Sequence, residues 1–80
     1  NMVILDTTRR IKIVDWAIYN RWGAKIFAMK QDVIANPVIV EWDGTYKGNP
    51  APSDTYIVKA VATDINGFSK FYSEMFTLVR

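Results

Sequence analysis

The feature that most constrains the fold is an alternation of apolar side chains on both sides of a glycine-containing corner, between residues 11 and 27. Before the corner, two sets of side chains fall on opposite faces: Val14, Trp16 and Ile18 on one, Ile13, Ala17 and Tyr19 on the other. A period of two is typical of a strand, and the β-branched residues here also favour strand over helix. Asn20 and Gly23 bracket the corner, where glycine accepts a positive φ without a Cβ clash. The segment therefore predicts a β-hairpin.

A second hairpin is predicted near the C-terminus. Residues 55–63 alternate again, and one face carries Tyr56, Val58, Ala60 and Ala62. Asn66 and Gly67 then form a two-residue turn signal of the type I′ kind, which needs positive φ at both central positions. Residues 68–79 return as the partner strand, with Phe71 and Met75 on one face and Tyr72, Phe76 and Leu78 on the other.

The remaining segments are short or irregular. Residues 2–5 and 38–40 are short strand candidates, and residues 30–37 are compatible with a short helical turn. Asp15 marks either a bulge or a solvent-facing strand face. Residues 43–54 are rich in turn signals and predict an ordered loop with Trp42 and Tyr46 as its apolar anchors. The fold class expected is all-β, an immunoglobulin-like antiparallel β-sandwich of about six or seven short strands.

Composition excludes several classes of function. The 80 residues make one domain, residues 1–80, half of whose side chains are apolar, and the chain has no cysteine and no histidine. It therefore lacks the usual general base near neutral pH and the commonest zinc ligands, so we expect no enzyme, no metal site and no cofactor. The net charge is +2, and Arg9 with Arg10 is the only adjacent basic pair, so we expect no nucleic-acid binding.

The chain ends and apolar runs bear on localisation. No apolar run approaches the roughly 20 residues that span a bilayer, so we expect no membrane insertion of the chain's own. The N-terminal residues lack a basic segment followed by a long apolar one, which is the pattern of a signal peptide. The chain opens on Asn1 rather than Met, which indicates a fragment or a processed piece.

Several side chains have two readings. Trp16, Trp22 and Trp42 form either a stacking platform for sugar rings or part of a small core, and the core or edge cover is favoured for each. Arg21 is either a clamp that stacks on an aromatic ring and ties the corner to the Asp43 loop, which is favoured, or an exposed contact for a partner's carboxylates. The aspartates beside turns suggest calcium, but their spacing favours turn capping; they are Asp43, Asp54 and Asp64.

Four runs occur in order along the chain: residues 19–23 (YNRWG), 42–48 (WDGTYKG), 52–56 (PSDTY) and 77–80 (TLVR). Together they resemble the gliding motility-associated C-terminal domain of the Bacteroidetes. That family is the type B C-terminal sorting domain of proteins exported by the type IX secretion system. Two departures are Asp54 and Glu74, where members usually carry glycine. The resemblance implies an immunoglobulin-like fold and a non-catalytic role at the end of a much larger exported protein, with the first strand missing or divergent here.

The resemblance also implies site residues and partners. The structural signature would be Asn20, Arg21, Trp22, Gly23, Trp42, Asp43, Gly44, Tyr46 and Gly48. Partner recognition would fall on Phe76, Thr77, Leu78, Val79 and Arg80, the last strand, whose free edge can add to a sheet in a partner. The implied partners are the large translocon barrel, a shuttle barrel and a dedicated outer-membrane barrel. The domain would pass through the periplasm to the outer-membrane surface or the extracellular space.

Two other functions are compatible with the sequence. One is a carbohydrate-binding or adhesion module, which requires at least two tryptophans exposed and coplanar. The other is an immunoglobulin-like spacer within a multidomain surface protein, which would function at any position in a chain.

Overall fold

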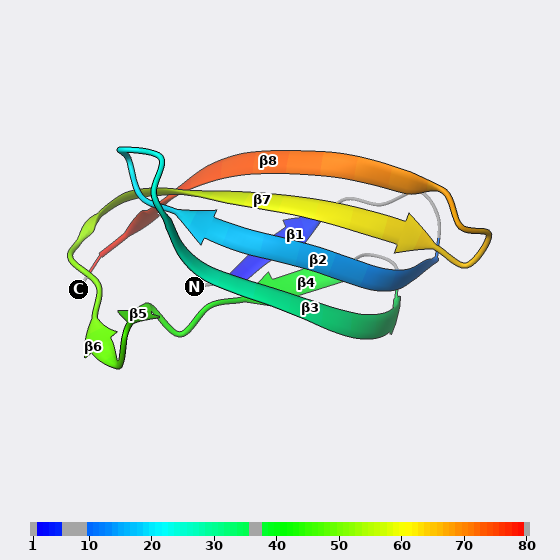
Figure 1. The fold of residues 1–80 in the computed structure, drawn as a ribbon, viewed down its shortest axis with the longest axis horizontal. Coiled ribbons are helices and arrows are strands. Elements are labelled where there is room, and N and C mark those ends of the chain that lie inside the picture. The colour runs from blue at the N-terminus through cyan, green and yellow to red at the C-terminus, as the bar shows by residue number, and fades with distance from the viewer. Residues whose placement is uncertain (1, 6–9, 36–37, 80) are drawn as a thin grey trace.

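The computed structural model describes residues 2–5, 10–35 and 38–79, and the described residues form eight strands and no helix (Figure 1). The strands are β1 (Met2–Leu5), β2 (Ile11–Tyr19), β3 (Lys25–Ala35), β4 (Val38–Glu41), β5 (Thr45–Tyr46), β6 (Asn49–Pro50), β7 (Asp54–Asp64) and β8 (Ser69–Leu78). Every pairing is antiparallel. The all-β prediction is confirmed, although four strands have nine to eleven residues and are longer than expected.

The strands form two layers. One is a four-stranded sheet in the order β3-β2-β7-β8, and the other is the β1–β4 pair, which lies behind that sheet in Figure 1. The strand predicted for residues 2–5 is confirmed as β1, paired with β4 through Met2↔Glu41 to Leu5↔Val38. The β5–β6 hairpin lies at one end of the molecule, together with the β2–β3 turn and the end of β8 (Figure 1). The arrangement is a small β-sandwich.

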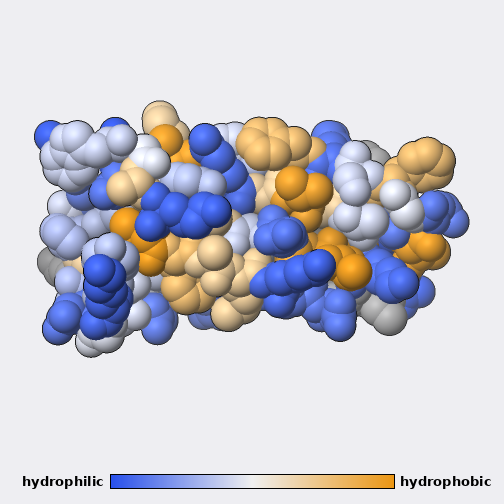
Figure 2. Space-filling model, viewed as in Figure 1, coloured by the Kyte–Doolittle hydropathy of each residue, from blue (hydrophilic) through white to orange (hydrophobic). Residues whose placement is uncertain are grey.

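The core lies on one face of the four-stranded sheet, as the alternation predicts. The buried apolar side chains of β2 and β7 on this face are Ile11, Val14, Trp16, Ile18, Tyr56, Val58, Ala60 and Ala62. Val40 of β4 packs against them, together with Trp42, which follows β4, and Ala51, which follows β6. The opposite face has no second layer among the described residues, and Figure 2 shows apolar and polar side chains interspersed over it.

Residues 30–37 correct one expectation. The described part of this segment continues β3 as far as Ala35 and contains no helical turn; Asn36 and Pro37 lie outside the described residues. The strand pairs with β2 from Lys25↔Tyr19 to Ala35↔Ile11, with a register shift near each end. Pairing with a neighbour supplies the hydrogen bonds that a weakly patterned segment cannot specify from its own sequence.

The bulge in β2 does not lie at Asp15. The register shifts between Ile11 and Ile13 against both neighbours: Lys12 is the extra residue against β7, whereas against β3 the extra residue lies on β3. Asp15 is a regular strand residue whose side chain is exposed, which is the second of the two predicted readings.

The turns between strands are partly as predicted. Gly23 has φ of 84°, as the first hairpin requires. The type I′ turn predicted at Asn66 and Gly67 is wrong, because Gly67 has a positive φ and Asn66 does not. The Gly67 N–H donates to the Asp64 carbonyl at 3.1 Å, and the Asp64 N–H donates to the Phe68 carbonyl at 2.8 Å. This is a three-residue connection, a type I turn completed by a left-handed glycine.

Candidate functional site

The candidate site is an apolar hollow at the end of the molecule where the β2–β3 turn, the β5–β6 hairpin and the start of β7 meet. It encloses about 350 Å³. Eight residues line it: Asn20, Trp22, Ile26, Tyr46, Ala51, Pro52, Asp54 and Tyr56. Its five aromatic and polar side chains come from three segments far apart in the sequence: Asn20 with Trp22, Tyr46, and Asp54 with Tyr56. The fold alone therefore creates this surface.

Asn20 builds the β2–β3 turn that carries the exposed part of the site. Its side-chain Oδ1 accepts hydrogen bonds from the N–H groups of Trp22 at 3.0 Å and Ala24 at 2.9 Å. Its main-chain N–H donates to the Ala24 carbonyl at 3.0 Å, and its carbonyl accepts from the Gly23 N–H at the same distance. An Asx side chain that fixes the N–H groups ahead of it makes the turn rigid. Arg21 and Trp22 are therefore presented on a defined backbone.

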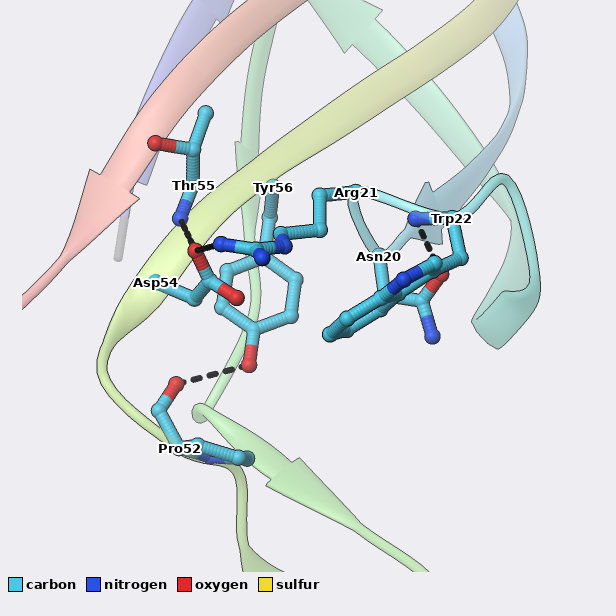
Figure 3. Close-up of polar contacts among 7 residues, drawn as sticks. All are labelled: Asn20, Arg21, Trp22, Pro52, Asp54, Thr55 and Tyr56. Carbon is cyan, nitrogen blue, oxygen red and sulfur yellow. Dashed lines mark hydrogen bonds and ion pairs between the residues drawn. The ribbon is translucent and has the colours of Figure 1, made fainter.

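Trp22 is the main correction among the predicted site residues. It was expected to fill the core or cover an edge, yet it is 74% exposed. The reason is its place in the turn that Asn20 closes, where the indole lies beside the Arg21 guanidinium rather than in the core (Figure 3). An exposed indole beside an apolar hollow is a feature of recognition surfaces.

Arg21 stacks on Trp22 as predicted, and it ties the turn to Asp54, the last residue of the predicted 43–54 loop. Its guanidinium carbon lies 4.6 Å from the centre of the Trp22 ring. One terminal nitrogen, Nη1, lies 3.7 Å from Oδ1 of Asp54, where the predicted loop ends and β7 begins (Figure 3). Both side chains keep solvent contact, so the ion pair contributes about 0–1 kcal/mol. The guanidinium is an orienting contact that remains available to a partner.

Tyr56 forms the floor of the site. The ring is buried, and its hydroxyl donates to the Pro52 carbonyl at 2.7 Å, closing the chain between residues 52 and 56 (Figure 3). The ring also contacts Trp42, with centroids 5.2 Å apart and planes at 65°, and Phe76, with centroids 6.1 Å apart. Edge-on and stacked aromatic pairs of this kind stabilise beyond the area they bury. The hollow thus rests on a fixed aromatic base.

Trp42 anchors the 43–54 loop as predicted, and Tyr46 does not. Trp42 is buried, and its Nε1 donates to the Thr45 carbonyl at 3.1 Å. Tyr46 is 41% exposed and lines the hollow from the β5–β6 hairpin. That hairpin turns at Lys47 and Gly48, both with positive φ (52° and 80°), as a type I′ turn requires.

Asp43 and Gly44 shape the entry to that hairpin. The Asp43 Oδ1 accepts from the Thr45 hydroxyl at 2.7 Å and the Thr45 N–H at 3.0 Å, the turn capping that the sequence predicts. The two hydrogen bonds, the hydroxyl one first, lower the pKa of the Asp43 carboxyl below its usual value. The Gly44 carbonyl accepts from the Ala51 N–H at 2.8 Å, which closes the loop behind the hollow.

The predicted recognition residues of the last strand fall into two groups. Leu78 is buried and Phe76 is half-buried, with its ring 6.1 Å from that of Trp42, so both belong to the core. Thr77 and Val79 are exposed, Val79 to 80%. Arg80 lies outside the described residues. Only part of this strand can therefore face a partner.

The structure also contradicts the tryptophan platform considered for sugar binding. Trp16 and Trp42 are buried, as the core reading predicts, and only Trp22 of the three is exposed. The aspartates beside turns are separate: Asp64 is buried in its own turn, and no group of three or more His, Cys, Asp or Glu side chains in the described residues could hold a metal ion. No helix in the same ranges has the length and apolar character to cross a membrane.

Sequence reasoning missed Pro52, Ala51 and Ile26 as parts of the site. Their role depends on the path of the 43–54 loop, and no local pattern predicts that path. The contact between Asp54 and Arg21 also depends on the path of this loop and was not predicted. The sequence indicated only that Asp54 immediately precedes a strand. The burial of Tyr56 could be predicted, because it is the first of the alternating apolar residues on the core face of β7.

Comparisons with protein-family models, with curated proteins and with solved structures find no match to the chain. What the fold adds is the convergence of the four runs that carry the resemblance. Asn20 and Trp22 of the first, Tyr46 of the second, and Asp54 with Tyr56 of the third line one hollow. The fourth run adjoins it, because Leu78 pairs with Asp54 across β8 and β7.

Proposed function

We propose that the chain is a non-catalytic C-terminal sorting module that directs its cargo through the type IX secretion system to the cell surface. The observation that carries the proposal is the convergence of four separate sequence runs, including the end of β8, on one end of a small β-sandwich. A sorting signal needs a rigid display of a few side chains rather than a reaction centre. The exposed Trp22, Arg21, Tyr46, Thr77 and Val79 provide such a display.

Three features support the immunoglobulin-like version of the fold that the resemblance implies. The order β3-β2-β7-β8 corresponds to the C′, C, F and G strands of a variable-type sandwich, and the β1–β4 pair corresponds to B and E. Trp16 is buried on β2, the strand equivalent to C, where such domains carry a core tryptophan. The Tyr56 hydroxyl bonds back to Pro52 at the start of β7, which is the geometry of a tyrosine corner.

The proposed partners are outer-membrane barrels: the translocon, a shuttle barrel and a dedicated barrel that retains the cargo at the surface. In this account Trp22 and Tyr46 supply apolar contact area to a barrel, and Arg21 supplies a planar charged group for a carboxylate or a carbonyl. Thr77 and Val79 supply the end of an edge strand, whose backbone can extend a partner's sheet.

The test is a reporter fused behind a general export signal and ahead of the 80 residues, expressed in a gliding Bacteroidetes strain and scored at the surface and in the medium. Deleting residues 77–80 would also remove the buried Leu78, so the informative variant is Thr77→Asp with Val79→Asp. We expect it to leave the reporter in the periplasm. The matched control is Ile65→Asp with Phe68→Asp, two exposed positions at the opposite end of β8, which should be delivered normally. Normal delivery of the first variant would contradict the recognition role of the last strand.

A second candidate is adhesion or carbohydrate binding, because Trp22 and Tyr46 stand exposed at the rim of the apolar hollow. One indole and one phenol ring can hold a sugar ring, although the platform of several tryptophans is not formed. Titration with soluble oligosaccharides, followed by tryptophan emission, tests this function. A saturable change that disappears in Trp22→Phe would favour it over sorting as the role of the hollow.

A further inference from the structure

β8 is an edge strand that carries exposed apolar side chains and charged side chains. Among the described residues it pairs only with β7, so one side of its backbone is open. Phe71 is 61% exposed and Met75 is 74% exposed, both on the uncovered face of the sheet. Exposed edge strands normally carry features that prevent pairing with other chains. On β8 the features of this kind are two charged side chains of opposite sign, Lys70 and Glu74.

The charged residues of β8 are placed symmetrically about Tyr72. Lys70 lies two residues before it and Glu74 two residues after it, so the three side chains share one face of the strand. If the strand pairs antiparallel with a copy of itself centred on Tyr72, each Lys70 lies opposite a Glu74. We propose that the chain forms a two-fold dimer in which β8 pairs with β8 of a second copy in this register, making one continuous eight-stranded sheet.

The uncovered face favours the same register independently. There β8 presents a small-large-small-large series: Ser69, Phe71, Ser73 and Met75. In the pairing centred on Tyr72, Phe71 lies opposite Ser73 of the second copy, and Met75 lies opposite its Ser69. Each large side chain therefore has a small one across from it, and Phe71 is a diagonal neighbour of both Phe71 and Met75 of the second copy. Both exposed apolar side chains gain cross-strand contacts, and the thioether gains aromatic contact.

The other registers either place like charges opposite one another or leave the charges unpaired. Moving the centre to Lys70 puts two lysines opposite one another, and moving it to Glu74 does the same with two glutamates, which destabilises a strand pair. Centres at Phe71 and Ser73 leave both charges without a partner of opposite sign. Lys70 and Glu74 therefore disfavour pairing with an unrelated strand, but they favour pairing with a second copy in the register centred on Tyr72.

The dimer leaves the proposed recognition residues accessible. Pairing in this register extends over residues 69–75, so Thr77 and Val79 lie beyond the paired segment at each end. The candidate hollow lies at that same end and is not covered by the β8 edge. The inference does not rest on the sorting function, and either proposal can fail while the other stands.

Charge reversal tests the dimer. The molar mass of the 80-residue chain is measured by light scattering after size-exclusion chromatography over a dilution series, with far-UV circular dichroism to verify folding. We expect a dimer for the chain, a shift to monomer for Lys70→Glu and for Glu74→Lys, and recovery of the dimer when both substitutions are combined. Lys47→Glu, a reversal of an exposed charge in the β5–β6 turn, is the matched control and should stay dimeric. A chain that is monomeric throughout, or a dimer indifferent to both single reversals, would overturn the proposal.

Cross-linking tests the register, because the chain has no cysteine of its own. In Tyr72→Cys the two introduced cysteines lie directly opposite, within the about 4.4–6.8 Å Cα separation that a disulfide needs. We expect a covalent dimer on mild oxidation. In Lys70→Cys the two cysteines lie four residues apart along the strand, about 13 Å, and should not cross-link. Cross-linking of Lys70→Cys but not of Tyr72→Cys would show another register and contradict the inference.

Discussion

Asn20 and Asp64 close the two long hairpins with the same set of hydrogen bonds. Each main-chain N–H donates to the carbonyl four residues ahead, at 3.0 Å for Asn20 and 2.8 Å for Asp64. Each side-chain Oδ1 accepts from the N–H groups two and four residues ahead, at 2.9–3.0 Å. In both turns the glycine three residues ahead has a positive φ and donates to the carbonyl of the Asx residue. One turn chemistry therefore builds both ends of the sheet.

The two turns differ in burial, and this predicts different mutational costs. Asp64 is 3% exposed, whereas Asn20 is half-buried. We expect Asp64→Ala to lower the free energy of unfolding by about 1–3 kcal/mol, and Asn20→Ala by about 0.5–1.5 kcal/mol. Asp64→Asn keeps the acceptor that Asn20 uses in the equivalent turn and should cost less than Asp64→Ala. Urea unfolding followed by circular dichroism measures all three, and equal losses for Asp64→Ala and Asp64→Asn would show that the shared acceptor is not what matters.

The Tyr56 hydroxyl predicts a further loss of stability. Tyr56→Phe keeps the ring contacts with Trp42 and Phe76 and removes the hydrogen bond to the Pro52 carbonyl. We expect a decrease of about 1 kcal/mol in the free energy of unfolding, because an isosteric change leaves one acceptor without its donor. Tyr46→Phe, at an exposed position, is the control and should unfold like the parent chain. A Tyr56→Phe chain as stable as the parent would exclude this bond as the closure of the 52–56 segment.

Much of the fold could be predicted from local pattern. The faces of β2, β7 and β8 follow from period-two alternation, because burial of one sheet face dictates the side-chain type at every second position. The extension of β3 to Ala35 could not be predicted, because residues 30–35 have no clear pattern of their own and become a strand by pairing with β2. The type of the second turn could not be predicted from its two central residues either. Asn66 and Gly67 have the composition of a two-residue turn, but the Asp64 side chain stabilises a three-residue one.

The site was less predictable than the fold. Trp42 and Tyr46 have similar local surroundings in the sequence, yet one is buried and the other lines an open hollow. Which aromatic of a turn-rich loop faces the core depends on the path of the loop across the sheet. The exposure of Trp22 was equally unpredictable from its neighbours in the sequence, because it depends on the turn that Asn20 closes.

The lowered pKa of Asp43 predicts a change with pH. A carboxyl whose pKa is lower in the folded than in the unfolded chain stabilises the fold above the unfolded-state pKa, and this contribution is lost as the pH falls through the lowered value. Thr45→Val removes the hydroxyl that is the largest cause. We therefore expect the Asp43 pKa to rise toward its usual value, measured by NMR titration of the carboxyl carbon. Thr77→Val should leave it unchanged, and an unchanged value in Thr45→Val would contradict the assignment.

Trp22 and Phe68 offer a matched pair for the recognition surface. Both are exposed aromatics in hairpin turns, 74% and 67%, at opposite ends of the four-stranded sheet. We expect Trp22→Ala to reduce surface delivery of the reporter several-fold and Phe68→Ala to leave it unchanged, because only Trp22 adjoins the hollow. Quantitative immunodetection at the surface of intact cells measures both. Equal effects of the two substitutions would place recognition elsewhere.

The measurement that tests the central proposal most directly is export of the parent reporter in isogenic strains with and without the type IX translocon. Surface or medium signal is compared with signal retained in the periplasm after the outer membrane is opened. The account predicts delivery in the first strain and periplasmic retention in the second. Delivery in both strains, or retention in both even when native upstream sequence is restored, would contradict it and favour the adhesion module.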